Sequence, residues 1–186
     1  YDLFIDYIFN MSTKITLIQW DITEQDTDAI VNAANSTLLW WWGVDGAIHR
    51  AGWPAIIEEC EKIIKTKLPN GLPTGEAVIT TWWKLAAKRV IHTVWPVYSR
   101  YKDDSRKDLL ASCYKNSLKL AKDHWAKTIA FPSISTWIYR CPIEVCSEIA
   151  IGTVKEFIKN NPELEEVRFV LFSEKDYQTY EKTLKN

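Results

Sequence analysis

Two asparagines and an aspartate stand near one another in a single polar segment, and they carry the groups needed to hold a sugar and to activate water. Asn32 and Asn35 lie at the end of a short apolar run, and Asp45 follows within Gly-Val-Asp-Gly. A carboxamide donates and accepts hydrogen bonds, which suits ribose hydroxyls, and a carboxylate can orient or deprotonate a water molecule. Asparagines also form plain turns, but the adjacent Gly-Val-Asp-Gly favours a ligand site.

Two further loops have chemical potential. Asp21 follows the first apolar run, where a carboxylate either accepts from a base amine or caps a turn, and taken alone the cap is favoured. The segment 132–139 is small and polar and precedes a helix that starts at Pro142. Backbone N–H groups at such a helix start can cradle phosphate. Tyr139 would then stack on a sugar or base, although a plain strand-to-helix connection is equally consistent with this loop.

Strand and helix patterns alternate along the chain. Apolar runs predict strands at 15–19, 29–31, 77–80, 90–94, 128–131 and 167–171. Apolar faces and end signals predict helices at 54–64, 108–122, 142–158 and 173–184. This alternation favours an α/β sandwich with helices on both faces of a mostly buried sheet. Ligands bind such sheets outside the carboxyl ends of the strands, so the expected site walls are the loops that follow Gln19, Ala33, Val94 and Phe131.

Length and charge limit the partners. A chain of 186 residues fits one domain, which we expect to span 14–186 after an N-terminal flank, 1–13. The net charge of −1 does not favour nucleic acid or a membrane surface as a partner. No apolar run approaches the about 20 residues of a membrane helix, and no basic segment resembles a signal peptide. We therefore expect a cytoplasmic monomer.

The four cysteines are expected to be reduced. Cys60, Cys113 and Cys146 fall on apolar faces of predicted helices, and Cys141 lies in a loop. None is spaced from a histidine as in common metal sites. Buried thiols of a cytosolic protein are the favoured interpretation, and a disulfide pair or a catalytic cysteine is the less favoured one.

Taken together, these motifs resemble the macrodomain family, of the type that removes mono-ADP-ribose from proteins. The resemblance runs from Lys14 to Leu184, nearly the whole chain, and its motifs are specific in combination. They are Asp21-Ile22-Thr23, Val31-Asn32-Ala33-Ala34-Asn35, Gly43-Val44-Asp45-Gly46-Ala47-Ile48-His49, Pro73-Thr74-Gly75-Glu76-Ala77, His92-Thr93-Val94 with Pro96-Val97, and Phe131-Pro132-Ser133-Ile134-Ser135-Thr136.

The resemblance implies a three-layer α/β/α sandwich with a central mixed sheet, and ADP-ribose or an ADP-ribosylated protein as the partner. By the same resemblance, Asp21 binds the adenine amine, Asn35 holds the distal ribose, and Asp45 positions or activates the water that cleaves the ester at the anomeric carbon. Neither a metal nor a cofactor is implied. The remaining ligand-binding residues that it implies are Ile22, Asn32, Gly43, Val44, Ser135, Thr136, Trp137, Ile138, Tyr139 and Phe172.

The implied activity is removal of mono-ADP-ribose from acidic side chains and deacetylation of O-acetyl-ADP-ribose. One alternative is a reader module that binds ADP-ribose without cleaving it, and another is a form inactivated by tryptophan at site glycines. A third takes the indoles as a stacking surface for single-stranded nucleic acid. The net charge of −1 counts against this third alternative.

Tryptophan is the systematic departure from the family. The chain has 10 Trp and 6 Gly, whereas about 7% glycine is usual. Trp125 lies in a helix-to-strand turn where glycine is common. The nine others stand where the family usually has glycine: Trp20, Trp40, Trp41, Trp42, Trp53, Trp82, Trp83, Trp95 and Trp137. If four positions need positive φ, the strain totals roughly 4–12 kcal/mol, so we expect a marginally stable chain that binds its ligand poorly.

Three explanations are open. Some bacteria read the UGA codon as glycine, and translating UGA as tryptophan would give this pattern. The others are deliberate mutagenesis and a genuine tryptophan-rich pocket for a different ligand. We favour recoding, because tryptophan falls on glycine sites while Phe and Tyr, at 6 and 8, are not enriched beside it.

Overall fold

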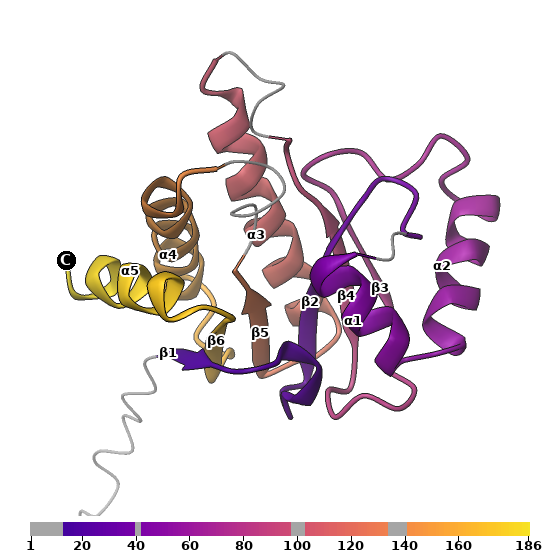
Figure 1. The fold of residues 1–186 in the computed structure, drawn as a ribbon, viewed down its shortest axis with the longest axis horizontal. Helices are drawn as coiled ribbons and strands as arrows, with labels where there is room; N and C mark the ends of the chain where they lie inside the picture. The colour runs from indigo at the N-terminus through magenta and orange to yellow at the C-terminus, as the bar shows by residue number, and fades with distance from the viewer. Residues whose placement is uncertain (1–12, 40–41, 98–102, 134–140) are drawn as a thin grey trace, which may run out of the picture.

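A computed structural model describes residues 13–39, 42–97, 103–133 and 141–186. In these residues one central sheet lies between two layers of helices (Figure 1), which confirms the predicted three-layer α/β/α sandwich. The strands are β1 (Lys14–Gln19), β2 (Ala29–Ala34), β3 (Ala77–Thr80), β4 (Val90–Val94), β5 (Thr128–Pro132) and β6 (Glu166–Leu171). The helices are η1 (Ile22–Glu24, a 3₁₀ turn), α1 (Gly43–Ala51), α2 (Ala55–Thr66), α3 (Ser105–Asp123), α4 (Ile143–Lys159) and α5 (Glu174–Lys185).

The sheet is mixed, as expected. Its strand order is β1-β6-β5-β2-β4-β3, and every neighbouring pair is parallel except β3 with β4. Five strands therefore run in one direction, and their carboxyl ends meet at one edge of the sheet, which we call the carboxyl edge. This edge is where a parallel sheet offers its ligand site.

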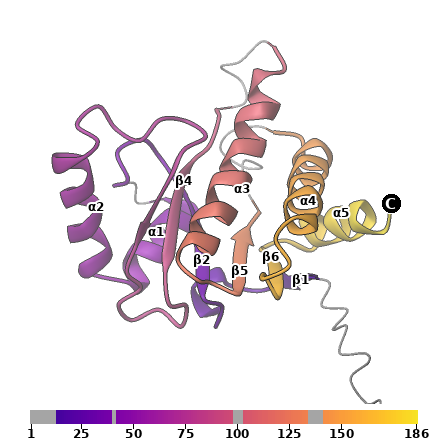
Figure 2. The same cartoon turned by 180° about the vertical axis from the view of Figure 1, so that it is seen from behind.

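Side-chain alternation on the strands builds two cores, one on each face of the sheet. On β2, Ala29 and Val31 join the core under α3, α4 and α5, whereas Ile30 and Ala34 join the core under α1 and α2. Figure 2 shows α3 crossing one face of the sheet. Asn32 has the parity of Ile30, so its side chain faces α1 and α2.

The predicted elements are confirmed, with shifted ends. The strands predicted at 77–80 and 90–94 are β3 and β4, with the predicted bounds. The strand predicted at 29–31 is β2, which continues three residues further, to Ala34. Ser173 caps α5 as expected, because its hydroxyl accepts from the backbone N–H of Asp176 at 3.1 Å. None of the helices in the described ranges is both long and apolar enough to cross a membrane.

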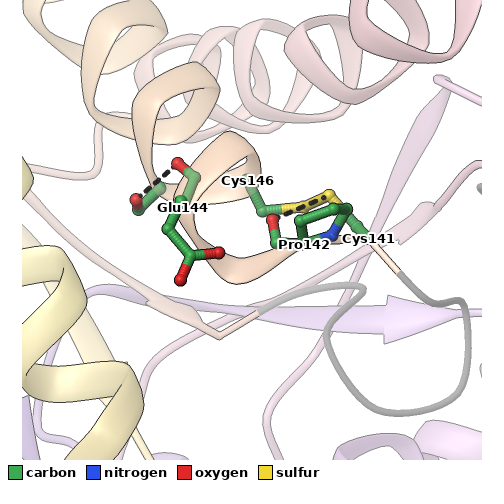
Figure 3. The surroundings of a disulfide bond; sticks show 5 residues. Cys141, Pro142, Glu144 and Cys146 are labelled. Carbon is green, nitrogen blue, oxygen red and sulfur yellow. Dashed lines mark hydrogen bonds between the residues drawn. A yellow bond between two sulfur atoms is a disulfide. The ribbon is translucent and has the colours of Figure 1, made fainter.

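The expectation of four reduced thiols is wrong for two of them. Cys141 and Cys146 form a disulfide at the start of α4 (Figure 3), while Cys60 and Cys113 are buried free thiols. The helix that starts after Pro142 turns Cys146 back toward Cys141, so their Cα atoms lie 6.3 Å apart, within disulfide range. The apolar face of α4 thus carries Cys146, which is bonded to Cys141 and is not a free thiol.

Two of the described tryptophans have the left-handed backbone that glycine adopts most easily. Trp125 has φ 60° and follows α3 in a Schellman motif, in which Ala126 N–H donates to the carbonyl of Ala121 and Trp125 N–H to that of Lys122. Trp83 has φ 48° in a turn closed by Leu85 N–H on the Trp82 carbonyl. Both indoles are exposed, at 91% and 55%, so no buried contact offsets the backbone strain.

We expect Trp83→Gly and Trp125→Gly each to raise the melting temperature. Left-handed backbone costs an L-residue about 1–2 kcal/mol, and about 1 kcal/mol shifts the Tm of a domain of this size by roughly 2–4 °C. Trp42 supplies the matched control, since it is 73% exposed but has φ −115°. Thermal melts should show a gain for Trp83→Gly and Trp125→Gly and none for Trp42→Gly. Equal shifts in all three variants would contradict the strain argument.

Candidate ligand and catalytic site

The carboxyl edge carries several of the residues that the sequence singled out. Asp21 follows β1, Asn35 follows β2 and Phe172 follows β6. Asp45 lies in α1, which packs against β2 and η1. Residues far apart in the chain are thus brought to one side of the sheet.

Asp21, Ile22 and Phe172 lie at the end of the edge formed by β1 and β6. Gln19 pairs with Leu171 in the sheet register, so the segments that follow them emerge side by side. Asp21 is exposed and Phe172 is 84% exposed, whereas Ile22 is buried at 5%. The Asp21 Oδ1 caps η1, accepting from the backbone N–H and the hydroxyl of Thr23, both at 2.8 Å. Among the described residues these bonds use Oδ1 alone, so Oδ2 stays available to a base amine.

Asn35 begins the loop after β2 and is half-buried. Its Oδ1 accepts from the backbone N–H of Thr37 at 3.1 Å and from the Thr37 hydroxyl at 2.9 Å. This is the turn that asparagine commonly forms. Because the carbonyl end of the amide serves the turn, the Nδ2 group is the end that a ribose hydroxyl would meet.

Asp45 is buried, not exposed in a loop. It is the third residue of α1, and its side chain is 2% exposed. Its Oδ1 accepts from Asn32 Nδ2 at 2.5 Å, and His49 Nε2 lies 3.5 Å from the same oxygen. The helix N-terminus favours a negative charge at this position. Oδ2 has no hydrogen-bond partner among the described residues.

A buried imidazole lies next to this pair. Asn32 Nδ2 lies 3.0 Å from His92 Nδ1, and His92 Nε2 lies 2.9 Å from the hydroxyl of Thr80. That hydroxyl donates to the Thr81 carbonyl at 3.2 Å, so it accepts from His92. Burial, followed by the nearby His49, lowers the pKa of His92 to about 3, so the ring is neutral at physiological pH, with its single proton on Nε2.

Cys60 lies near two histidines that are distant from it in sequence. The ligand atoms of His49, Cys60 and His92 all lie within 4.8 Å of one another, and two imidazoles with a thiolate are a zinc donor set. However, the Cys60 sulfur lies 3.8 Å from the protonated His92 Nε2, and burial raises the pKa of the Cys60 thiol to about 12. In this hydrogen-bonded form, the three groups do not fit a metal.

The other predicted ligand residues fall into two groups. Gly43 is exposed with φ 61°, and Val44 is half-buried against the core under α1 and α2. The residues predicted in the loop before Pro142 lie outside the described ranges: Ser135, Thr136, Trp137, Ile138 and Tyr139. Trp40 and Trp41 also lie outside them.

Sequence reasoning assigned no role to Thr80, His49 or His92. A usable signal existed for His92, a polar residue inside the apolar strand Val90–Val94. Its register partner on β2 is Asn32, the polar residue of that otherwise apolar strand. Two polar side chains on one face of neighbouring buried strands are expected to contact each other.

Sequence and structure comparisons agree with this geometry. A family model, the Macro domain, matches residues 31–150. A Macro domain-containing protein of Streptomyces nogalater is 52% identical over 172 residues, which cover 92% of each chain. The chain belongs to the macrodomain family. The similarity extends to an ADP-ribose glycohydrolase of Mus musculus, MACROD2, at 45% identity over 176 residues, which cover 94% of this macrodomain and 36% of that protein.

Solved structures show the same macrodomain fold. An Oceanobacillus iheyensis macrodomain with ADP matches at a TM-score of 0.90 and 41% identity, covering 94% of this chain and 91% of that one. A Trypanosoma brucei macrodomain in complex with ADP-ribose matches at 0.81 and 38%, covering 90% and 68%. The strand order and layers described above are therefore those of the family.

Proposed function

We propose that this macrodomain binds ADP-ribose along the carboxyl edge and removes mono-ADP-ribose from acidic side chains, with O-acetyl-ADP-ribose as a related substrate. The order of the strands is the observation that carries the proposal. Along β1-β6-β5-β2, the edge presents Asp21 and Phe172, then the carboxyl end of β5 at Pro132, then Asn35 after β2, the strand whose Asn32 contacts Asp45. At about 4.8 Å per strand the span is about 14 Å. Adenine, diphosphate and distal ribose follow one another in the same order in ADP-ribose.

Relatives support this proposal from two sides. Two similar macrodomains have been solved with ADP and with ADP-ribose, and a relative at 45% identity is an ADP-ribose glycohydrolase. The two solved complexes support ADP-ribose as the ligand, and the glycohydrolase supports hydrolysis as the activity. We assign the ester bond at the anomeric carbon as the bond that is cleaved because of the expected role of Asp45 in activating water there.

In the proposed reaction, water attacks the anomeric carbon of the distal ribose. The water proton passes to the Asp45 carboxylate, and the bond between the anomeric carbon and the ester oxygen breaks. The protein's Glu or Asp carboxylate leaves with the electron pair. Asn35 holds the ribose so that the anomeric carbon faces this water.

The reader function is the second candidate, and the burial of Asp45 favours it. The Asp45 side chain is 2% exposed and one oxygen is already engaged by Asn32. A buried carboxylate can hold the loop that contacts the ribose without meeting a water. Release of ADP-ribose from a modified protein decides between the two, because a reader binds the product and releases none.

Asp21→Ala is expected to weaken ADP-ribose binding by about 1–3 kcal/mol, the cost of losing one charged hydrogen bond to the base. Inorganic phosphate, which has no base, should bind as before. Thr23→Ala is the control, since it removes one of the two contacts to Asp21 Oδ1, that of the Thr23 hydroxyl, keeps the backbone N–H contact, and does not touch Oδ2. In calorimetry, a similar loss for Thr23→Ala and Asp21→Ala would show that Asp21 supports the loop instead of the base.

A further inference from the structure

Four side chains form a hydrogen-bonded row beneath the candidate site: Thr80, His92, Asn32 and Asp45, here called the buried polar row. We propose that His92 is a positioning residue, which fixes the Asp45 carboxylate through Asn32, and that Thr80 fixes the tautomer of His92. The inference rests on the proposed role of Asp45 in hydrolysis. It gives a part in the reaction to residues that lie within the core.

Three members of the row stand on three neighbouring strands of the sheet. Asn32 and His92 are direct register partners on β2 and β4, and Thr80 lies at the end of the antiparallel neighbour β3. All three side chains are at most 3% exposed. Groups held on paired strands keep their geometry better than groups on loops, so the row is suited to hold a carboxylate in one orientation.

The amide of Asn32 connects the imidazole to the carboxylate. Its Nδ2 group has two protons, one for Asp45 Oδ1 at 2.5 Å and one for His92 Nδ1 at 3.0 Å. Turning the amide over would place Oδ1 against the carboxylate oxygen, which is repulsive. The Asp45 carboxylate and the lone pair on His92 Nδ1 therefore both hold the same end of Asn32, its Nδ2 group.

Thr80 keeps that lone pair in place. The Thr80 hydroxyl gives its proton to the Thr81 carbonyl, so toward His92 it can only accept. His92 must then carry its proton on Nε2, which leaves Nδ1 free to accept from Asn32. The groups that face the ring, His49 and the Cys60 thiol, lie in the same buried cluster. Since the pKa of His92 is about 3, the row does not switch near neutral pH.

The consequence for hydrolysis is orientation. With Oδ1 engaged by Asn32, Oδ2 is the Asp45 oxygen without a partner among the described residues, and it is the one left for water. Misplacing a reacting group by about 1 Å can cost roughly 100-fold in rate. Loss of the row should therefore lower kcat while leaving the ligand contacts at the surface unchanged.

The kinetic test is Thr80→Val beside Thr80→Ser. Valine keeps the shape but removes the acceptor, so we expect kcat to fall roughly 10- to 100-fold with little change in KM or in the Kd for ADP-ribose. Serine keeps the hydroxyl and should restore most of the lost kcat. Thr153→Val on α4 is the control for losing a buried threonine hydroxyl elsewhere, as Thr153 is 6% exposed. Equal kcat for Thr80→Val and Thr80→Ser overturns the proposal.

The structural test does not depend on activity. NMR of the unaltered chain with ¹⁵N-labelled histidine should show His92 protonated on Nε2, and Thr80→Val should shift it toward the Nδ1 tautomer. If the unaltered chain and its glycine variants hydrolyse nothing, the proposed hydrolysis fails, while the tautomer still tests the arrangement. A His92 protonated on Nδ1 in the unaltered chain overturns the inference whatever the activity.

Discussion

Asp45→Ala is expected to abolish most hydrolysis while ADP-ribose still binds. General-base catalysis contributes about 10²- to 10⁴-fold to a rate. No other carboxylate among the described residues contacts Asn32, the residue that holds Asp45, so none is placed to replace it. The measurement is release of ADP-ribose from a modified protein, made in a chain that carries Trp40→Gly, Trp41→Gly, Trp42→Gly and Trp137→Gly so that site glycines are present. Asn35→Ala in the same chain should weaken both turnover and placement of the ribose.

The structure changes what Asp45→Ala should do to stability. A loop carboxylate would be replaced at little cost, but Asp45 is buried in α1 and accepts from Asn32. Leaving that donor without a partner costs about 1–3 kcal/mol, so a lower Tm is expected. Asp45→Asn keeps the size of the side chain and separates the loss of charge from the loss of packing. Unchanged turnover in Asp45→Ala would remove Asp45 from the mechanism and favour water activation by the substrate itself.

Changing all ten tryptophans to glycine is expected to raise the melting temperature and the affinity for ADP-ribose together. This runs against the usual rule, because glycine in an ordinary position destabilises by roughly 0.5–1 kcal/mol. Two of the described tryptophans have positive φ, and Trp42 immediately precedes α1, the helix of Asp45, without a side-chain cap hydrogen bond. The measurements are a thermal melt and calorimetry with ADP-ribose on both chains, each verified by intact mass.

Among the ten substitutions, Trp95→Gly gives the most decisive single test of recoding. Trp95 is 2% exposed and packs edge-on against Tyr114 at 5.5 Å between ring centroids. If this packing were native, removing the indole would cost at least about 3–5 kcal/mol. Its Nε1 is nevertheless buried without a hydrogen-bond partner among the described residues, as expected for an indole in a site shaped for glycine. A strong loss of stability in Trp95→Gly, or equal stability and binding in the two full chains, would contradict recoding.

Periodicity and turn chemistry predicted the strands, the helices and an α/β sandwich, whereas the mixed sheet was implied by the family resemblance. The run Val90–Val94 reads as a strand because it is short, apolar and β-branched, and the strand has those bounds. Ser173 precedes the last helix and caps it. Both signals depend on neighbouring residues in the sequence, so they can be recognised without knowledge of the tertiary structure.

The candidate site was less predictable because its inner part depends on register. Asn32 was expected to face the ligand, yet it is fully buried, with its amide on Asp45 and His92. Only the pairing of β2 with β4 brings it opposite His92. Likewise, the disulfide of Cys141 and Cys146 depends on where α4 starts, which spacing alone did not show.

We propose above all that this macrodomain hydrolyses the ester between ADP-ribose and an acidic side chain. The most direct measurement is mass spectrometry of a glutamate-modified protein after incubation with the chain carrying glycine at all ten tryptophan positions. We expect free ADP-ribose and unmodified glutamate in equal amounts, with little of either when Asp45→Ala is added. A glycine-bearing chain that binds ADP-ribose in calorimetry but releases none from the modified protein would contradict it and identify a reader.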